Sequence, residues 1–122
     1  MRVLQAGKRF CEIELGALSV VMLLDGETVM PVECLLRPDG TALEGAELAG
    51  ADMRDGQLHL PVRAFLVRGP GGCLLIDCGA GKAWHKALGH LGTAMAEAGI
   101  GAQEVTAIAL THTHVDHVSG LV

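Results

Sequence analysis

The 122-residue chain is predicted to form a domain of the α/β class. Two apolar runs joined by a Gly-rich turn, within residues 62–76, predict a β-hairpin. Apolar residues then recur at helical spacing over residues 82–98, and a further apolar run at 105–110 ends directly before a group of histidines. A strand, a helix and a strand in this order predict a crossover unit, which is right-handed if the two strands are parallel neighbours.

Composition narrows the class of protein. Apolar residues make up 50% of the chain, charged residues 19% and aromatic residues 2%, so we expect a folded domain with an aliphatic core. The formal net charge is -5 and no basic stripe is visible, which disfavours a nucleic-acid partner. The apolar run at 17–24 is too short to span a bilayer and is wrongly flanked for a signal peptide. We therefore expect a cytoplasmic protein with no membrane partner.

The cysteines form no Cys-x-x-Cys pair, and three of the four lie in apolar, strand-like runs. Buried, reduced thiols are the favoured interpretation, with a disulfide or a cysteine metal site as the alternative. The four residues are Cys11, Cys34, Cys73 and Cys78.

The first half of the chain has the weaker pattern. Residues 10–15 alternate weakly and predict an edge strand, and residues 18–24 predict a buried strand that ends in a turn at Asp25-Gly26. Residues 27–56 are rich in Gly, Pro, Asp and Ala, so we expect an irregular excursion with one short helix near 46–53. Such a stretch often covers or lines a site.

The second half has the clearer pattern. Strands are predicted at 62–67 and 73–76, with the turn at 69–72 between them, and residues 77–81 break the second strand sharply. A helix is predicted at 82–98 and stops at Gly99. One face of this helix would carry the apolar residues Trp84, Leu88, Leu91, Met95 and Ala98. A buried strand at 105–110 follows.

Four potential metal ligands crowd into six residues after that strand: His112, His114, Asp116 and His117. Residues two apart in an extended segment point to the same side, so His112 and His114 can approach one cation. Asp116 and His117 follow where the chain must turn, and they can face a second point nearby. Nitrogen and oxygen donors without thiolate suit Zn, Fe or Mn in a catalytic site better than a structural zinc. A polar loop that merely carries histidines is the alternative.

Such a site would act through water. A divalent metal ion lowers the pKa of bound water to about 7, and two ions roughly 3.5–4 Å apart can hold hydroxide and polarise a carbonyl or phosphoryl oxygen. Asp116 is the candidate catalytic residue, because its carboxylate can both bind metal and orient the nucleophile.

Residues 111–117 resemble the His-x-His-x-Asp-His motif of the metallo-β-lactamase superfamily. The hairpin that ends in Asp77-Cys78-Gly79 is similar to the family's hairpin ending in Asp-Thr-Gly. The resemblance covers residues 60–122 well, whereas residues 1–59 fit only as variable N-terminal strands and a substrate-side loop. It is strongest for the lactonase and organophosphate-hydrolase-like branch.

This resemblance implies the N-terminal half of an αββα sandwich, so that the domain in 1–122 is partial. It implies two zinc ions, with His112 and His114 on the first and Asp116 and His117 on the second; iron or manganese are alternatives. Asp77 would be a buried residue that braces the metal loop without binding metal. From the residues alone, Asp77 could equally be a turn-forming aspartate.

The chain departs from the family pattern in three ways. Cys78 replaces the usual Thr, and Ser119 stands where the first of two glycines is common; neither is a ligand position. The family's later ligands, a third His, a bridging Asp and a last His, have no counterpart. His85 and His90 are expected to be solvated helix residues, and His59 a loop residue. Each metal would then have two side chains, below the three of a usual catalytic zinc site, so the truncated chain is expected to be inactive by itself.

Three functions are consistent with these residues and with the resemblance. The first is a zinc-dependent hydrolase that attacks an ester, lactone or phosphoester-type small molecule. The second is a persulfide-dioxygenase-like oxidoreductase on the same fold, with one Fe(II). The third is a non-catalytic, truncated chain whose exposed apolar surface favours self-association, with a homo-oligomer as one form. The substrate itself is not predicted, because specificity in such folds comes from loops around the site.

Overall fold

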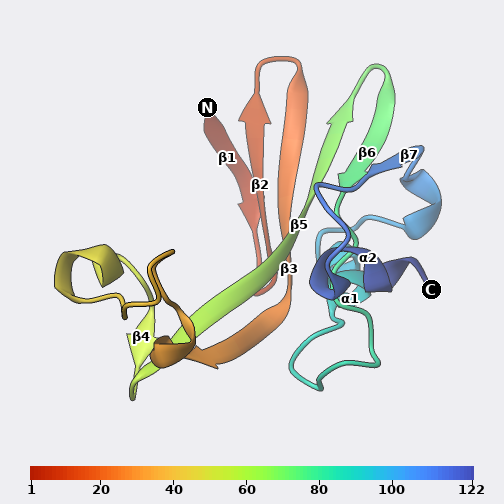
Figure 1. The fold of residues 1–122 in the computed structure, drawn as a ribbon. Coiled ribbons are helices and arrows are strands. Elements are labelled where there is room, and N and C mark those ends of the chain that lie inside the picture. The colour runs from red at the N-terminus through yellow and green to blue at the C-terminus, as the bar shows by residue number, and fades with distance from the viewer. The chain divides into compact units, whose positions relative to one another are not determined.

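The structure, a computed structural model, describes all of residues 1–122 and is dominated by β-strands (Figure 1). Seven strands are hydrogen-bonded in the order β1-β2-β3-β5-β6-β7, with β4 paired to β5. Two short α-helices accompany them, which confirms the predicted α/β class. The chain divides into two compact units, one formed by Met1–Gly26 with Val62–Val122 and the other by Glu27–Pro61.

The elements have the following bounds. The strands are β1 Arg2–Ala6, β2 Phe10–Leu15, β3 Leu18–Pro31, β4 Met53–Arg54, β5 Gln57–Gly69, β6 Gly72–Ile76 and β7 Ala107–Ala109. The α-helices are α1 Leu91–Glu97 and α2 Val115–Val118. Single 3-10 turns are η1 Val32–Cys34, η2 Gly45–Leu48, η3 Ala102–Glu104 and η4 Ser119–Leu121.

The predicted edge strand at 10–15 is a strand, but it does not lie at the edge. It is β2, and β1 pairs with it antiparallel, with Ala6 opposite Cys11. All five residues of β1 are exposed, so this strand has no alternation of buried and exposed positions by which the sequence could reveal it.

The predicted turn at Asp25-Gly26 is wrong, because β3 continues through it to Pro31. Asp25 is fully buried, and its carboxylate accepts backbone N–H groups from distant residues instead of closing a local turn. Gly26 is needed for close approach, since a Cβ there would overlap the backbone carbonyl of Ala87.

The second unit, Glu27–Pro61, is largely irregular, as predicted. The helix expected near 46–53 is only the single 3-10 turn η2. His59 is not a loop residue: it lies on β5, where its Nδ1 is 2.6 Å from Oε1 of Glu27.

The predicted hairpin is confirmed by the antiparallel pairing of β5 and β6, from Phe65 opposite Ile76 to Gly69 opposite Gly72. β7 lies on the other side of β6 and runs parallel to it, with Leu75 opposite Ile108. The two parallel strands joined through a helix are therefore also as predicted.

The helix predicted at 82–98 begins nine residues late, because α1 covers only Leu91–Glu97. Gly89, with a φ of +81°, interrupts the path, and Trp84 is 51% exposed instead of lying on an apolar face. The end at Gly99 is confirmed, with a φ of +71°. Gly99 N–H donates to Ala96 C=O at 3.0 Å and Ile100 N–H to Met95 C=O at 2.9 Å, the two bonds of a Schellman motif.

The strand predicted as buried at 105–110 is the three-residue β7, and all three of its residues are exposed. β7 ends the order of strands and pairs only with β6, so one of its sides lacks a neighbour. The aliphatic run at 105–110 thus correctly predicted a strand but wrongly predicted that the strand is buried.

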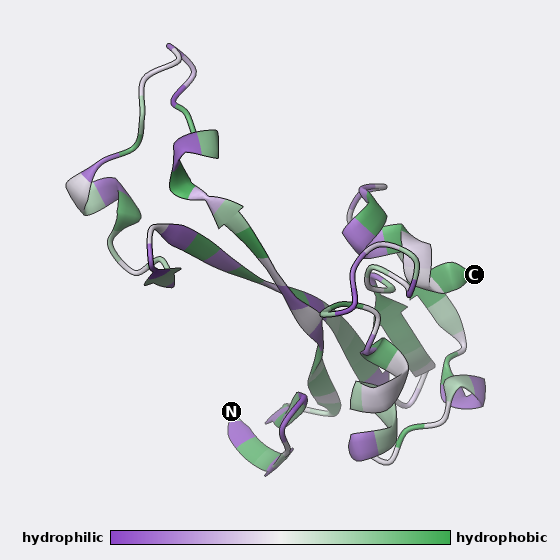
Figure 2. Cartoon of the chain, turned by 90° about the horizontal axis from the view of Figure 1, so that it is seen from below, coloured by the Kyte–Doolittle hydropathy of each residue, from purple (hydrophilic) through white to green (hydrophobic).

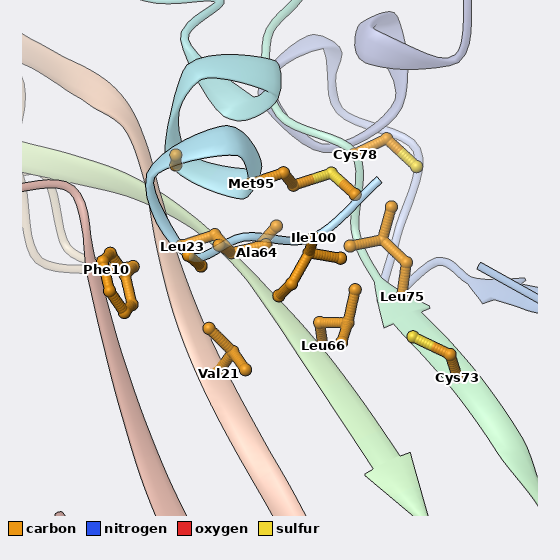
Figure 3. Close-up of a cluster of buried hydrophobic side chains, with 12 residues drawn as sticks. Phe10, Val21, Leu23, Ala64, Leu66, Cys73, Leu75, Cys78, Met95 and Ile100 are labelled. Carbon is orange, nitrogen blue, oxygen red and sulfur yellow. The ribbon is translucent and has the colours of Figure 1, made fainter. Parts of the chain in front are cut away.

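The core lies between the strands of the first unit and α1 (Figure 3). Met95 of α1 and Ile100 after it lie over side chains from β3, β5 and β6, among them Val21, Leu66 and Leu75. In Figure 2, hydrophobic and hydrophilic bands follow one another along the long strands, as expected where residues alternate between the faces of a sheet. Phe10 is the only aromatic residue of the core, as the low aromatic content predicts.

The four cysteines are free thiols. Cys73 and Cys78 are buried as expected, whereas Cys11 is half-buried and Cys34 is exposed. No helix in the chain is both long and apolar enough to cross a membrane.

Candidate metal centre

The histidine motif lies at the carboxyl edge of two parallel strands. Asp77 directly follows β6, and residues 111–117 follow β7. Because the two strands are parallel, their carboxyl ends meet at one edge of the sheet, the edge at which open α/β sheets bind ligands. Asp77 N–H donates to the Ala109 carbonyl at 2.9 Å and joins the two segments where the strands end.

Three histidine rings gather in this segment. The ring centroids of His112 and His114 are 4.7 Å apart with an interplanar angle of 80°, and those of His112 and His117 are 4.0 Å apart. His112 and His114 are exposed, whereas His117 lies in α2 with 23% of its side chain exposed. The extended segment and the short helix after it thus bring the rings together from both sides of a bend.

The carboxylate of Asp77 is hydrogen-bonded to both ends of this segment. Its carboxylate accepts the Thr111 N–H at 2.8 Å, the Thr111 hydroxyl at 2.8 Å and His117 Nδ1 at 2.8 Å. Burial raises the pKa of Asp77, but the hydrogen bonds from Thr111 and His117 outweigh it and leave the pKa below its ordinary value. Asp77 has a φ of +62°, so the chain turns sharply at this residue. Its side chain contacts the motif through Thr111 and His117.

An ionised carboxylate only accepts hydrogen bonds, so the contact with Asp77 places a proton on His117 Nδ1. His117 Nε2 is then the atom that faces away from Asp77, 3.3 Å from Oδ2 of Asp116. Fixing one ring nitrogen in this way is how proteins prepare the other nitrogen for a ligand.

Thr111 extends the same arrangement to His112, and it is a residue that sequence reasoning missed. The single hydroxyl proton of Thr111 is directed to Asp77, so its oxygen accepts from His112 Nδ1, 3.0 Å away. The other ring nitrogen of His112, Nε2, is thereby the one available to a ligand. The signal was present in the sequence, since Thr111 directly precedes the first histidine, but its role depends on Asp77, 34 residues earlier.

The loop after Asp77 is joined to the motif by its backbone. Cys78 N–H donates to the His117 carbonyl at 2.8 Å, and Gly120 N–H donates to the Gly79 carbonyl at 3.2 Å. A Cβ at Gly120 would overlap the Cys78 carbonyl, so a glycine is required at this crossing. Cys78 and Ser119, which differ from the residues usual in the family, both lie where the two loops touch, since a Cβ at Gly81 would overlap the Ser119 carbonyl.

The side chains of the motif have donor atoms that suit a metal ion, but they are not arranged around one. Imidazole nitrogen and carboxylate oxygen suit Zn, Fe and Mn. However, no group of three or more His, Cys, Asp or Glu side chains in the chain is arranged to hold a metal ion. The predicted ligands His112, His114, Asp116 and His117 thus lie close together without converging on common points, and His117 Nε2 faces Asp116 instead.

The other histidines lie outside this cluster. His85 is exposed and its Nδ1 accepts the Ala87 N–H at 3.1 Å, and His90 is half-buried directly before α1. Both were expected within a helix, and both precede it because α1 begins late. His59 belongs to the other compact unit.

Comparison with known proteins identifies the family. Residues 59–122 match the family model described as the metallo-beta-lactamase superfamily. No curated protein matches the chain. The model match covers more than half of the chain, including the hairpin, the helix and the histidine motif, and the chain therefore belongs to the metallo-beta-lactamase superfamily.

Solved structures agree with this assignment. The hydrolase AbOPH of the beta lactamase superfamily is 29% identical, with a TM-score of 0.78 over 95% of this chain and 40% of its own. AidC, a dizinc quorum-quenching lactonase, is 24% identical, with a TM-score of 0.72 over 93% of this chain and 39% of its own. A probable metal-dependent hydrolase from Staphylococcus aureus is 22% identical, with a TM-score of 0.72 over 89% of this chain and 42% of its own.

This chain therefore spans about 40% of the length of the structures it resembles. Its fold is that of the corresponding part of a metallo-beta-lactamase domain, and its superfamily relatives include hydrolases.

Proposed function

We propose that this chain is part of a metal-dependent hydrolase that acts on a small molecule with an ester, lactone or phosphoester-type bond. The observation that carries this proposal is the set of three adjacent histidine rings, two of which have their Nδ1 held by Asp77, directly or through Thr111. Membership of a superfamily with hydrolase relatives supports it.

The proposed metal ligands are His112 and His114 for one ion, and Asp116 and His117 for a second. Zinc is the proposed metal, since AidC is a dizinc lactonase, with iron or manganese as alternatives. When bound, such an ion lowers the pKa of water to about 7 and so supplies a nucleophile at neutral pH.

The residues of the chain have separate roles in this proposal. Asp77 holds the proton on His117 Nδ1, and Thr111 accepts the proton of His112 Nδ1, which fixes both rings. The Asp116 carboxylate would orient the attacking water, and it is the proposed catalytic group. Further ligands would come from segments that the longer solved structures contain and these 122 residues do not.

For the 122 residues alone, we propose weak zinc binding and slow turnover, because two side chains per ion are fewer than the three of a usual catalytic zinc site. A cytoplasmic location, a small-molecule substrate and a homo-oligomer are part of the same proposal.

The test is metal analysis combined with turnover of the whole gene product, purified without added metal. Bound zinc with hydrolysis of a homoserine lactone, an aryl ester or a phosphotriester is the expected result. His112→Ala and His117→Ala should each lower the zinc content and the rate, while His85→Ala, an exposed histidine outside the cluster, should leave both unchanged.

Two outcomes would count against hydrolysis. One iron per chain with thiol-dependent oxygen uptake would favour the persulfide-dioxygenase-like alternative. Zinc content that responds equally to His85→Ala and His117→Ala would exclude the motif as the metal site and favour a non-catalytic chain.

A further inference from the structure

Asp25 is the most completely buried charged side chain of the first unit, with 0% exposure. It lies on β3, more than fifty residues before the loops that it contacts. Its Oδ2 accepts Ala80 N–H at 3.2 Å and Gly89 N–H at 2.9 Å, and its Oδ1 accepts Leu91 N–H at 3.0 Å. A carboxylate is placed in a dry interior only when donors compensate for the lost water, as three backbone N–H groups do here.

These contacts place Asp25 directly beneath the loop that carries Asp77. Gly79 approaches so closely that a Cβ there would overlap the Asp25 carboxylate. The opposite side of the same loop is bonded to the histidine motif, through Cys78 N–H to the His117 carbonyl and Gly120 N–H to the Gly79 carbonyl. The loop at 77–81 is therefore held between Asp25 on one side and residues 117–120 on the other.

Asp25 also determines where α1 begins. It accepts the N–H of Leu91, the first residue of the helix, and its own carbonyl accepts the His90 N–H at 3.0 Å. One side chain thus ties β3, the loop after β6 and the start of α1 to a single point.

We infer that Asp25 is a positioning residue for the proposed metal centre: its buried carboxylate holds the 77–81 loop, and through that loop Asp77 and the His117 ring, in the arrangement described above. This positioning role rests on the proposed function only in that the centre binds a metal, because Asp25 bonds to the 77–81 loop and that loop bonds to His117 whether or not a metal is bound. It adds a residue outside the histidine motif on which the geometry of the motif depends.

The test compares the wild-type chain with Asp25→Ala, Asp25→Asn and a matched control, Glu12→Gln. Glu12 is another buried carboxylate of the same unit, but its partners are Gln5, Ser19 and Arg68, none of which touches the 77–81 loop. Two quantities are measured by NMR at pH 8: amide hydrogen exchange, and the ring ¹⁵N shifts that report the tautomer of His117.

In the wild type, we expect protected amides at Ala80, Gly89 and Leu91, and a single His117 tautomer with its proton on Nδ1. Asp25→Ala should speed exchange of these amides by about 10-fold or more, since each loses a bond to a charged acceptor, and His117 should show mixed tautomers. Asp25→Asn keeps one accepting oxygen, so its amide exchange rates and its His117 tautomer mixture should lie between those of the wild type and those of Asp25→Ala. Glu12→Gln should lower the stability of the chain while leaving the His117 tautomer unchanged.

An Asp25→Ala chain that keeps the wild-type His117 signals would overturn the inference, as would a wild-type Leu91 amide that exchanges as fast as an exposed one. If Asp25→Ala does not fold, the inference is still tested by the exchange rate of the Leu91 amide in the wild type and by the His117 tautomer in Asp25→Asn. The proposed function fails separately: a chain with the expected His117 tautomer that binds no zinc would retain the positioning role and lose the metal.

Discussion

At the scale of single residues, the candidate centre depends on which of the two ring nitrogens of each histidine carries the proton. Asp77 is buried and accepts from Thr111 and His117, so the protons of two histidines are arranged by one carboxylate and one hydroxyl. Removing such outer partners of a ligand histidine typically weakens metal binding by 10–100-fold.

Thr111→Val should therefore weaken zinc binding by about 10-fold, because it removes the acceptor for His112 Nδ1 while preserving the shape of the side chain. Thr111→Ser, which keeps the hydroxyl, should bind zinc as the wild type does. Isothermal titration with zinc measures both, and equal weakening in the two variants would show that the methyl group matters and the hydroxyl does not.

Glu12 should make the stability of the chain depend on acid pH. Burial raises the pKa of Glu12, but hydrogen bonds from Ser19, Gln5 and Arg68 lower it more, and the net pKa is below its ordinary value of 4.5. A carboxyl whose pKa is depressed by folding stabilises the chain above its unfolded pKa, and this contribution is lost as pH falls through the folded pKa. The free energy of unfolding should thus decrease as the pH falls below about 4.5.

Glu12→Gln should lower the free energy of unfolding at pH 7 by roughly 1–3 kcal/mol and flatten its decrease in acid. Urea unfolding at several pH values measures both. A variant that retains the full acid-dependent decrease would place its source in another carboxyl group.

At the scale of elements, α1 ends and begins for different reasons. Its end is local, because Gly99 adopts a φ of +71° and closes a Schellman motif within the six residues Met95–Ile100. Its beginning is not local, because Leu91 N–H is bonded to Asp25 on a distant strand. The sequence therefore predicts the end of the helix correctly and misplaces its start by nine residues.

Two glycines of this helix should respond in opposite directions to the same substitution. Gly92→Ala lies in the helix, meets nothing within 4 Å and should stabilise the chain by about 0.5–1 kcal/mol. Gly99→Ala also meets nothing within 4 Å but forces a side chain into a positive φ, and should destabilise by roughly 1–2 kcal/mol. Thermal unfolding of the pair measures the contrast, and a stabilised Gly99→Ala chain would contradict the αL assignment.

At the scale of the whole molecule, the hairpin of β5 and β6 is apolar on both faces. Leu66 and Leu75 face the core, whereas Phe65, 40% exposed, lies opposite Ile76 on the other face. Strands apolar on both faces are typical of sheets that are covered on both sides. A cavity of about 500 Å³, lined mainly by apolar residues such as Leu75, Met95 and Ile108, adds to the uncovered apolar surface.

We expect the 122-residue chain to self-associate and to bind a hydrophobic dye through these surfaces. Phe65→Ser should reduce both effects at a cost of less than about 1 kcal/mol, because the side chain is substantially exposed. The neighbouring Leu66→Ala, at 0% exposure, should instead destabilise by about 2–5 kcal/mol. Sedimentation velocity and dye fluorescence measure the effect of Phe65→Ser, and urea unfolding measures the effect of Leu66→Ala. A wholly monomeric wild type would refute the expected self-association.

By itself, the sequence determined the features that depend on neighbours along the chain. The hairpin with its Gly-rich turn, the helix end at Gly99, the strand before the motif and the density of ligand side chains in residues 111–117 were all readable, because turn chemistry, αL glycine and the period of strands are local. The motif and the hairpin also carried the resemblance that led to the superfamily.

Only the tertiary structure decided what depends on residues far apart in the chain. The pairing of exposed β1, the passage of β3 through Asp25-Gly26, the late start of α1 and the exposure of β7 each follow from a distant partner or from the lack of one. The roles of Asp25 and Thr111 arose in the same way, since each depends on a contact with a residue more than thirty positions away, Ala80 for Asp25 and Asp77 for Thr111. Local patterns specify which residues can form an element, whereas burial and hydrogen-bond partners depend on which segments meet.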